Sequence, residues 1–232
     1  MVRTGGRRPE GDEMPERTDT AHFAWDEVWK EDDGSEEWGG PEPFVLAEAT
    51  RLRLAGASRA LDLGCGVGRN ALALAALGFE VVALDLAPAG LAVTARRAEE
   101  AGLALRTVEA PMTDLPFEGD AFDYVVSWNV VYHGTRDVVA ASIAEVARVL
   151  GPGGTFQGTM LSKRRDDYGL GREVGRDAFV RPEAGGDKAH PHFFTNARET
   201  VELFEAFETR TLADFEPYGP GSWHWHVVAE KV

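Results

Sequence analysis

The decisive stretch of the chain is Leu61-Asp62-Leu63-Gly64-Cys65-Gly66-Val67-Gly68-Arg69-Asn70. Its short apolar run ends in three alternating glycines, and an Ala/Leu-rich segment at residues 71–76 follows them. This order predicts a strand, a tight turn and a helix. Glycines in such a turn let the backbone approach a bound molecule closely, so the turn is a candidate ligand site.

A second apolar run, residues 81–84, ends in Asp85. An acid at the tip of the second strand of such a unit is well placed to accept hydrogen bonds from both hydroxyls of a ribose. The two runs together predict that the chain binds a nucleoside cofactor.

The charge of Asp62 bears on which cofactor this is. Residues 66–71 fit a dinucleotide fingerprint that ends in alanine, so a nicotinamide dinucleotide is one alternative. A carboxylate two residues before the first glycine would repel a pyrophosphate at the helix N-terminus. It would attract the cationic ammonium and sulfonium of S-adenosylmethionine. Charge therefore favours S-adenosylmethionine, and a tight turn without any ligand is the remaining alternative.

Three further landmarks follow in order, at residues 112–117 (Met-Thr-Asp-Leu-Pro-Phe), 122–127 (Phe-Asp-Tyr-Val-Val-Ser) and 147–154 (Ala-Arg-Val-Leu-Gly-Pro-Gly-Gly). Together with residues 61–76 they resemble the class I S-adenosylmethionine-dependent methyltransferases, and most closely the tellurite-resistance and thiopurine-type small-molecule branch. The resemblance implies S-adenosylmethionine as cofactor and methyl transfer to a small-molecule acceptor by in-line displacement.

The resemblance also implies roles for single residues. Asp62 with the glycines would hold the methionine part of the cofactor, and Asp85 would hold the ribose. Leu86 would flank the adenine, while Asp114 contacts its exocyclic amine. The full set expected to bind the cofactor is Asp62, Gly64, Cys65, Gly66, Asn70, Asp85, Leu86, Thr113, Asp114 and Asn129.

Residues 127–134 follow the fourth expected strand and, by the resemblance, face the transferable methyl group. They lack the Asn/Asp-Pro-Pro-aromatic signature of the amino-group and amide methyltransferases, which argues against those substrates. Tyr132 and His133 are the candidate catalytic residues, because an imidazole titrates near neutrality and can act as a general base. The alternative for both is a structural ring beside the cofactor.

Two histidine pairs, His190-x-His192 and His224-x-His226, suggest a metal site. No acid or cysteine lies near either pair at a familiar ligand spacing, so no metal is expected. Six basic residues precede the first histidine pair: Lys163, Arg164, Arg165, Arg172, Arg176 and Arg181. They form either a solvent-exposed face or a binding site for an anionic acceptor.

Length and composition limit the function further. A chain of 232 residues suits one sizeable α/β domain. Its formal net charge of −15 argues against a nucleic-acid partner, which favours a basic protein face. Cys65 is the single cysteine, so no intramolecular disulfide forms. No run of eighteen apolar residues occurs, and a cytoplasmic protein without a membrane partner is expected. The sequence leaves the oligomeric state open.

The expected fold is a doubly wound, mostly parallel, seven-stranded Rossmann-like sheet with an antiparallel C-terminal strand pair. Residues 1–20 are expected to form a disordered tail. Residues 21–232 form a single domain, with cap helices in 21–55 that carry the candidate lid aromatics Trp25, Trp29 and Trp38. A polar, glycine-rich segment at 161–191 is expected to be a substrate lid without regular structure. Strands are expected at 59–63, 80–85, 104–109, 122–128, 154–160, 208–215 and 223–232.

Two other functions stay open at this stage. One is a binding protein that keeps the S-adenosylmethionine fold without turnover. The other is a methyltransferase that acts on a macromolecule.

Overall fold

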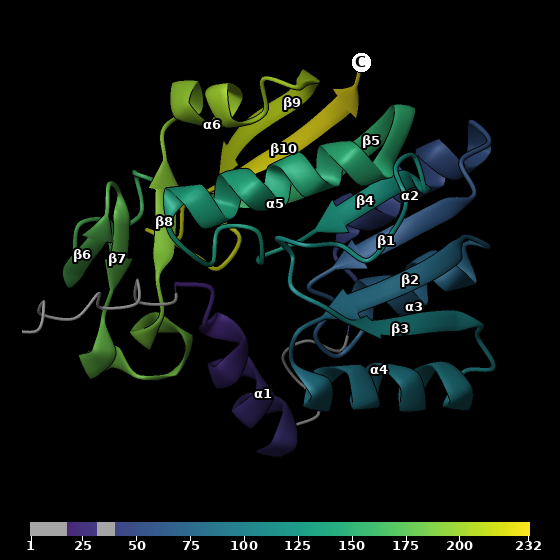
Figure 1. Cartoon of the computed structure of the whole chain (residues 1–232), viewed down its shortest axis with the longest axis horizontal. Helices are drawn as coiled ribbons and strands as arrows, with labels where there is room; N and C mark the ends of the chain where they lie inside the picture. Colours follow the sequence, from purple (N-terminus) through teal and green to yellow (C-terminus); the bar gives the residue numbers. More distant parts are fainter. Residues whose placement is uncertain (1–17, 32–39) are drawn as a thin grey trace, which may run out of the picture.

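The computed structural model describes residues 18–31 and 40–232 (Figure 1). Two expectations fall mainly or wholly outside these residues: the disordered tail at 1–20 and the lid aromatic Trp38.

The central sheet contains the seven expected strands. They are β1 (Arg59–Leu63), β2 (Glu80–Asp85), β3 (Leu105–Glu109), β4 (Phe122–Ser127), β5 (Leu150–Ser162), β9 (Phe207–Phe215) and β10 (His224–Lys231). Their order is β3-β2-β1-β4-β5-β10-β9, with β1 to β5 parallel and β10 antiparallel to both of its neighbours. This confirms the predicted mostly parallel sheet with an antiparallel C-terminal pair.

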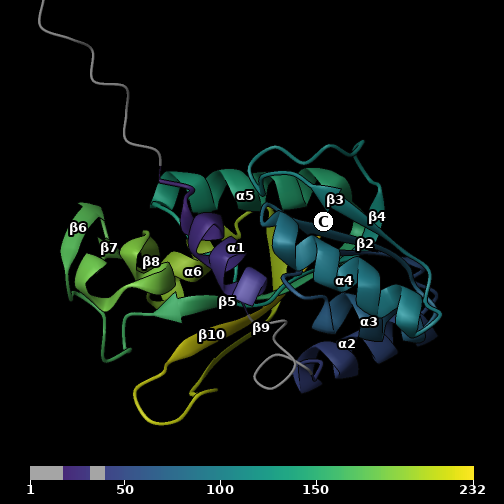
Figure 2. The same cartoon turned by 90° about the horizontal axis from the view of Figure 1, so that it is seen from below.

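Helices cover both faces of this sheet, because the strands are apolar on both sides. Along β1, Ala60 packs with α2 (Pro43–Leu54) and α3 (Arg69–Ala76), whereas Leu61 packs with α5 (Arg136–Val149). In Figure 2, α5 lies on one side of the sheet and α2 and α3 lie on the other. Two further helices are α4 (Pro88–Glu100) and α6 (Ala197–Leu203).

The segment at 161–191 differs from the expected irregular loop. It holds β6 (Arg172–Gly175), β7 (Ala178–Val180) and the 3₁₀ turns η1 (Pro182–Ala184) and η2 (Gly186–Ala189), and β8 (His192–Thr195) follows. β7 pairs with β6 and β8, and β8 extends the sheet at the end of β5. The prediction missed these strands because the apolar triplet 178–180 is too short to show a period. In the folded chain, contacts of the Phe179 ring with the Tyr168 and Phe194 rings stabilise β7.

Helix α1 (Ala21–Glu31) lies apart from the sheet, between α4 and η2 (Figure 1). Asp26 Oδ1 accepts a hydrogen bond of 2.8 Å from the backbone N–H of Ala89, in the first turn of α4. Acceptance of such an otherwise unpaired helix N–H stabilises the contact. Among the described residues no helix is both long and apolar enough to cross a membrane.

Candidate functional site

A cavity of about 340 Å³ opens at the carboxyl ends of the parallel strands, where ligands bind in doubly wound sheets. Its volume lies in the range of small-molecule sites. The walls come from α1, the glycine loop, the loops after β2, β3 and β4, residues 161–188 and the β9–β10 connection. Of the residues expected to bind the cofactor, the wall contains Gly64, Cys65, Gly66, Asp85, Leu86, Thr113 and Asn129.

The glycine loop requires glycine for two separate reasons. Gly64 has φ +75° and Gly66 has φ +53°, in the left-handed region that side chains disfavour. A Cβ on Gly64 would overlap the side chain of Val130, and one on Gly66 would lie 3.4 Å from Trp29. The bare backbone of the loop therefore packs against side chains that also line the cavity.

Asp85 ends β2 and fixes the glycine loop. Its Oδ2 accepts the N–H of Gly66 at 2.8 Å, and its Oδ1 accepts those of Leu86 at 2.7 Å and Ala87 at 2.9 Å. Burial raises the pKa of Asp85, and these three hydrogen bonds oppose that rise. Each oxygen has further acceptor capacity, so the carboxylate can also receive hydroxyl donors from the cavity.

Three expected cofactor residues, Asp62, Asn70 and Asp114, lie off the cavity wall. Asp62 points at the N-terminal turn of α3, where Oδ2 accepts the N–H of Ala71 at 2.9 Å. Burial raises its pKa to about 7. The Asn70 side chain accepts the N–H of Glu42 at 3.0 Å. Asp62 and Asn70 thus hold the elements around the glycine loop.

Asn129 lies directly after β4 with φ +62°, a conformation that asparagine tolerates better than most residues. Its N–H donates to Thr159 Oγ1 at 2.8 Å, and its side-chain amide donates to the Tyr218 hydroxyl. Asn129 therefore ties the end of β4 to β5 and to the β9–β10 connection, and it faces the cavity.

Tyr132 and His133 are both buried and both line the cavity. Burial raises the pKa of Tyr132 and is the main cause that lowers the pKa of His133 to about 4. The tyrosine hydroxyl and the neutral imidazole are accordingly uncharged near pH 7. His133 Nε2 is buried without a hydrogen-bond partner.

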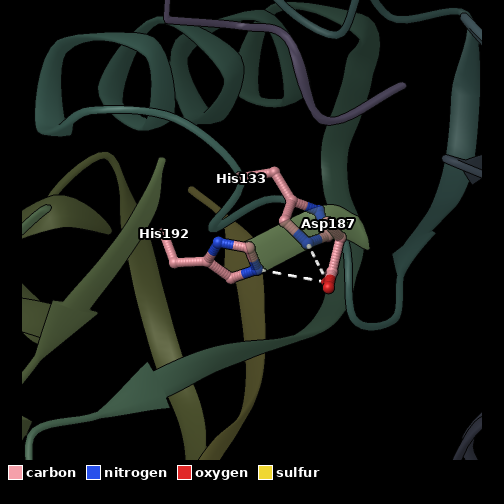
Figure 3. A group of neighbouring side chains, drawn as sticks. All are labelled: His133, Asp187 and His192. Carbon is pink, nitrogen blue, oxygen red and sulfur yellow. Dashed lines mark hydrogen bonds and ion pairs between the residues drawn. The ribbon is translucent and has the colours of Figure 1, made fainter. Parts of the chain in front are cut away.

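An acid lies beside His133 that the sequence did not reveal. Asp187 Oδ2, on η2, is 3.7 Å from His133 Nε2 and 3.3 Å from His192 Nε2 (Figure 3). Asp187 thus meets both histidines although it lies at no familiar ligand spacing from them in the sequence. The contact with His133 forms because η2 and the loop after β4 meet in the folded chain. His190 instead contacts Thr20, with 2.8 Å between its Nδ1 and the threonine Oγ1.

The second histidine pair divides between two environments on β10. His224 lines the cavity. His226 contacts Gln157 at 2.9 Å and packs against the Phe44 ring. Neither belongs to the group around Asp187.

The aromatic wall comes from α1. Trp25 and Trp29 stack with ring centroids 5.2 Å apart, and both line the cavity. Their expected role as lid aromatics stays a prediction, which this position favours.

Most of the basic residues of the 161–191 segment are paired inside it or with nearby strands and helices. Lys163 contacts Asp177 at 2.9 Å and Glu199 at 2.7 Å. Of the six residues considered, Arg165 lines the cavity, and its guanidinium is 2.8 Å from Asp167. These ion pairs argue against a site in which the six basic residues together bind an anionic acceptor. Other wall residues that the sequence did not single out are Asp19, His22, Asp187, Lys188 and Tyr218.

Comparisons with known proteins agree with this geometry. The family model described as a methyltransferase domain matches residues 60–154. A ubiquinone biosynthesis O-methyltransferase of Cereibacter sphaeroides (strain KD131) is 29% identical over 178 residues, which span 75% of this chain and 69% of that protein.

Solved structures share the fold. The 1,6-didemethyltoxoflavin-N1-methyltransferase of Burkholderia thailandensis superposes with a TM-score of 0.66 at 21% identity, over 91% of this chain and 88% of that one. TehB of Haemophilus influenzae superposes with a TM-score of 0.63 at 20% identity, over 86% of this chain and 66% of that one.

Proposed function

This chain belongs to the class I S-adenosylmethionine-dependent methyltransferases, and from that premise we propose that it methylates a small-molecule acceptor by in-line displacement within the cavity. One observation carries the proposal. The glycine loop and Asp85 share one cavity wall with Tyr132 and His133, among the described residues. Cofactor and acceptor can therefore meet in one space.

S-adenosylmethionine, the cofactor of this enzyme, supplies a methyl group on a positively charged sulfur. The residues on the wall fit its parts. Asp85 would accept the ribose hydroxyls, and Leu86 and Thr113, which line the same cavity, would contact the adenine. The backbone of Gly64 and Gly66 also lines the cavity and would contact the methionine part. Asp62 lies off the wall and holds the N-terminal turn of α3 through the Ala71 N–H.

The acceptor lies on the side of Tyr132 and His133. Its nucleophilic atom forms a bond to the methyl carbon as the carbon–sulfur bond breaks, and the bonding pair stays on sulfur. His133 Nε2 would accept a hydrogen bond from the nucleophile, because among the described residues this buried nitrogen has no hydrogen-bond partner within 3.5 Å, and Asp187 Oδ2 lies 3.7 Å away. Tyr132 packs beside it, and the two buried rings exclude water.

Two observations support a small acceptor. The cavity volume is that of a small-molecule site, and α1 and the 161–191 segment both contribute to its walls. Two similar proteins are named for small molecules: one for ubiquinone biosynthesis, and one that is bound to 1,6-didemethyltoxoflavin.

The test is release of S-adenosylhomocysteine from the purified chain with a panel of small hydroxyl, thiol, amine and metalloid acceptors. We expect turnover with at least one of them, and loss of turnover in Gly66→Val, whose side chain would meet Trp29. Turnover with protein or nucleic-acid acceptors alone would contradict a small-molecule acceptor.

A further inference from the structure

Three side chains converge in the geometry of a metal site, and two of them, His133 and Asp187, line the cavity. The nitrogens of His133 and His192 and a carboxylate oxygen of Asp187 all lie within 4.8 Å of one another (Figure 3). His133 follows β4, Asp187 lies on η2 and His192 begins β8, so three separate segments supply one group each.

The backbone holds the two histidines opposite each other. Gly134 N–H donates to the Pro191 carbonyl at 2.9 Å, and Phe193 N–H donates to the Tyr132 carbonyl at 3.0 Å. These two hydrogen bonds flank an antiparallel bridge between His133 and His192. The ring centroids are 4.7 Å apart and the rings are nearly perpendicular. The main chain therefore fixes the positions from which the two imidazoles approach each other.

The hydrogen bonds of the two histidines indicate which ring nitrogens can serve as ligands. His192 Nδ1 lies 2.9 Å from the His190 carbonyl oxygen, which accepts only if the proton is on Nδ1. That leaves the lone pair of Nε2 directed toward Asp187, as outer hydrogen bonds orient metal-binding histidines. His133 is 8% exposed, and its Nε2 has no hydrogen-bond partner. A buried nitrogen of this kind is costly unless something binds it.

We propose that His133, Asp187 and His192 bind one divalent transition-metal ion, with the remaining coordination positions open to the cavity. Two imidazoles and one carboxylate form the ligand set of many catalytic zinc and non-haem iron sites, which keep positions open for water or substrate. No role in holding S-adenosylmethionine is needed from these residues, because the glycine loop and Asp85 line the same cavity and are the residues proposed to hold it.

The function of the ion rests on the proposed function. A hydroxyl or thiol of the acceptor that coordinates the ion loses its proton to solvent more readily, and the resulting anion is the better nucleophile. His133 would then contact the nucleophile through the ion. The binding of the ion itself does not depend on what the acceptor is.

Lys188 is the competing cation. Its Nζ lies 3.3 Å from His192 Nε2 and 3.6 Å from Asp187 Oδ2. Four methylene groups connect this charge to the backbone, so it can move aside into the cavity that Lys188 also lines. Removal of the charge in Lys188→Met should tighten metal binding by about tenfold, because electrostatic competition disappears. A cluster that only stabilises the fold would show no such gain.

The experiment uses the full chain without an affinity tag, freed of metal by a chelator. Zn²⁺ binding is measured by equilibrium dialysis, and Co²⁺ binding by its visible absorption. We expect one ion per chain, and a loss of affinity of roughly 100-fold or more in His192→Gln and in Asp187→Asn. His190→Gln is the matched control, since this neighbouring histidine contacts Thr20 and should bind Zn²⁺ as the parent does.

S-adenosylhomocysteine affinity is measured on the same samples to show that each variant is folded. Wild-type protein that binds the cofactor product but no Zn²⁺, or equal Zn²⁺ binding in the parent and the two ligand variants, would overturn the metal site. A metal-loaded protein that methylates no small acceptor would instead contradict the proposed function and leave the site standing.

Discussion

At the scale of single residues, Asp85 has two roles, and two measurements on one variant can distinguish them. It organises the glycine loop through three backbone N–H groups, and it faces the cavity where the ribose is expected. The first role affects folding stability, whereas the second affects ligand affinity.

We predict that Asp85→Ala weakens S-adenosylhomocysteine binding by about 2 to 4 kcal/mol, because two charge-assisted hydrogen bonds to the ribose are lost. Calorimetry measures the affinity, and a thermal melt shows how far the loss of the loop contacts destabilises the chain. An unchanged dissociation constant would remove Asp85 from the binding site.

We predict that the free energy of unfolding depends on pH through Asp62. Its carboxyl is 2% exposed, and burial raises its pKa from 3.8 to about 7. Between these values the folded chain keeps a proton that the unfolded chain releases. The contribution of Asp62 to the free energy of unfolding therefore falls as the pH rises from about 4 to 7. Above pH 7 this contribution no longer changes.

Asp62→Asn keeps an oxygen for the Ala71 N–H but does not titrate. The stability of this variant relative to the parent should rise from pH 5 to pH 8, by an amount on the order of 1 to 3 kcal/mol. Urea unfolding at the two pH values measures this. The same difference between variant and parent at both values would show that Asp62 is not a protonated buried acid.

At the scale of elements, α1 packs directly over the glycine loop. Trp29 is 8% exposed, stacks on Trp25 and is the side chain nearest a Cβ placed on Gly66. A helix distant in sequence from the loop thus closes one side of the cofactor space.

We predict that Trp29→Ala lowers S-adenosylhomocysteine affinity by about tenfold or more, because the cavity loses a wall. Phe23→Ala is the matched control, since this aromatic residue on the same helix is 53% exposed and should leave the affinity unchanged. If Trp29→Ala lowers the stability of the chain but leaves S-adenosylhomocysteine affinity unaltered, α1 packs on the domain and does not contribute to ligand binding.

At the scale of the whole molecule, the cavity combines segments from most of the described chain. In the proposed function, the cofactor contacts wall residues of the Rossmann-like core, and the acceptor contacts mainly wall residues within 127–133 and 161–188. Cofactor binding and acceptor binding can therefore be lost independently.

A Gly/Ser linker in place of residues 163–188 should leave S-adenosylhomocysteine binding nearly normal, because the glycine loop and Asp85 are untouched. Methyl transfer should fall by about 100-fold or more, through lost positioning and water exclusion. The rate with the acceptor found in the panel measures this. Unaltered turnover would mean that the acceptor binds elsewhere, under α1.

Local signals in the sequence determined the core of the fold. The bounds of β1 and β2 were predicted to the residue, because apolar runs that end in glycine or aspartate are readable without the rest of the chain.

Only the tertiary structure decided how the site is assembled. Asp62 was expected near the cofactor, yet its carboxylate turns toward α3, because an N–H of that helix lies within hydrogen-bond reach. Asp187 was not expected at the site, yet it meets His133 and His192 there. Periodicity and spacing report on neighbours along the chain. A contact between η2 and the loop after β4 depends on how the sheet and its extension pack, and the sequence pattern carries no trace of it.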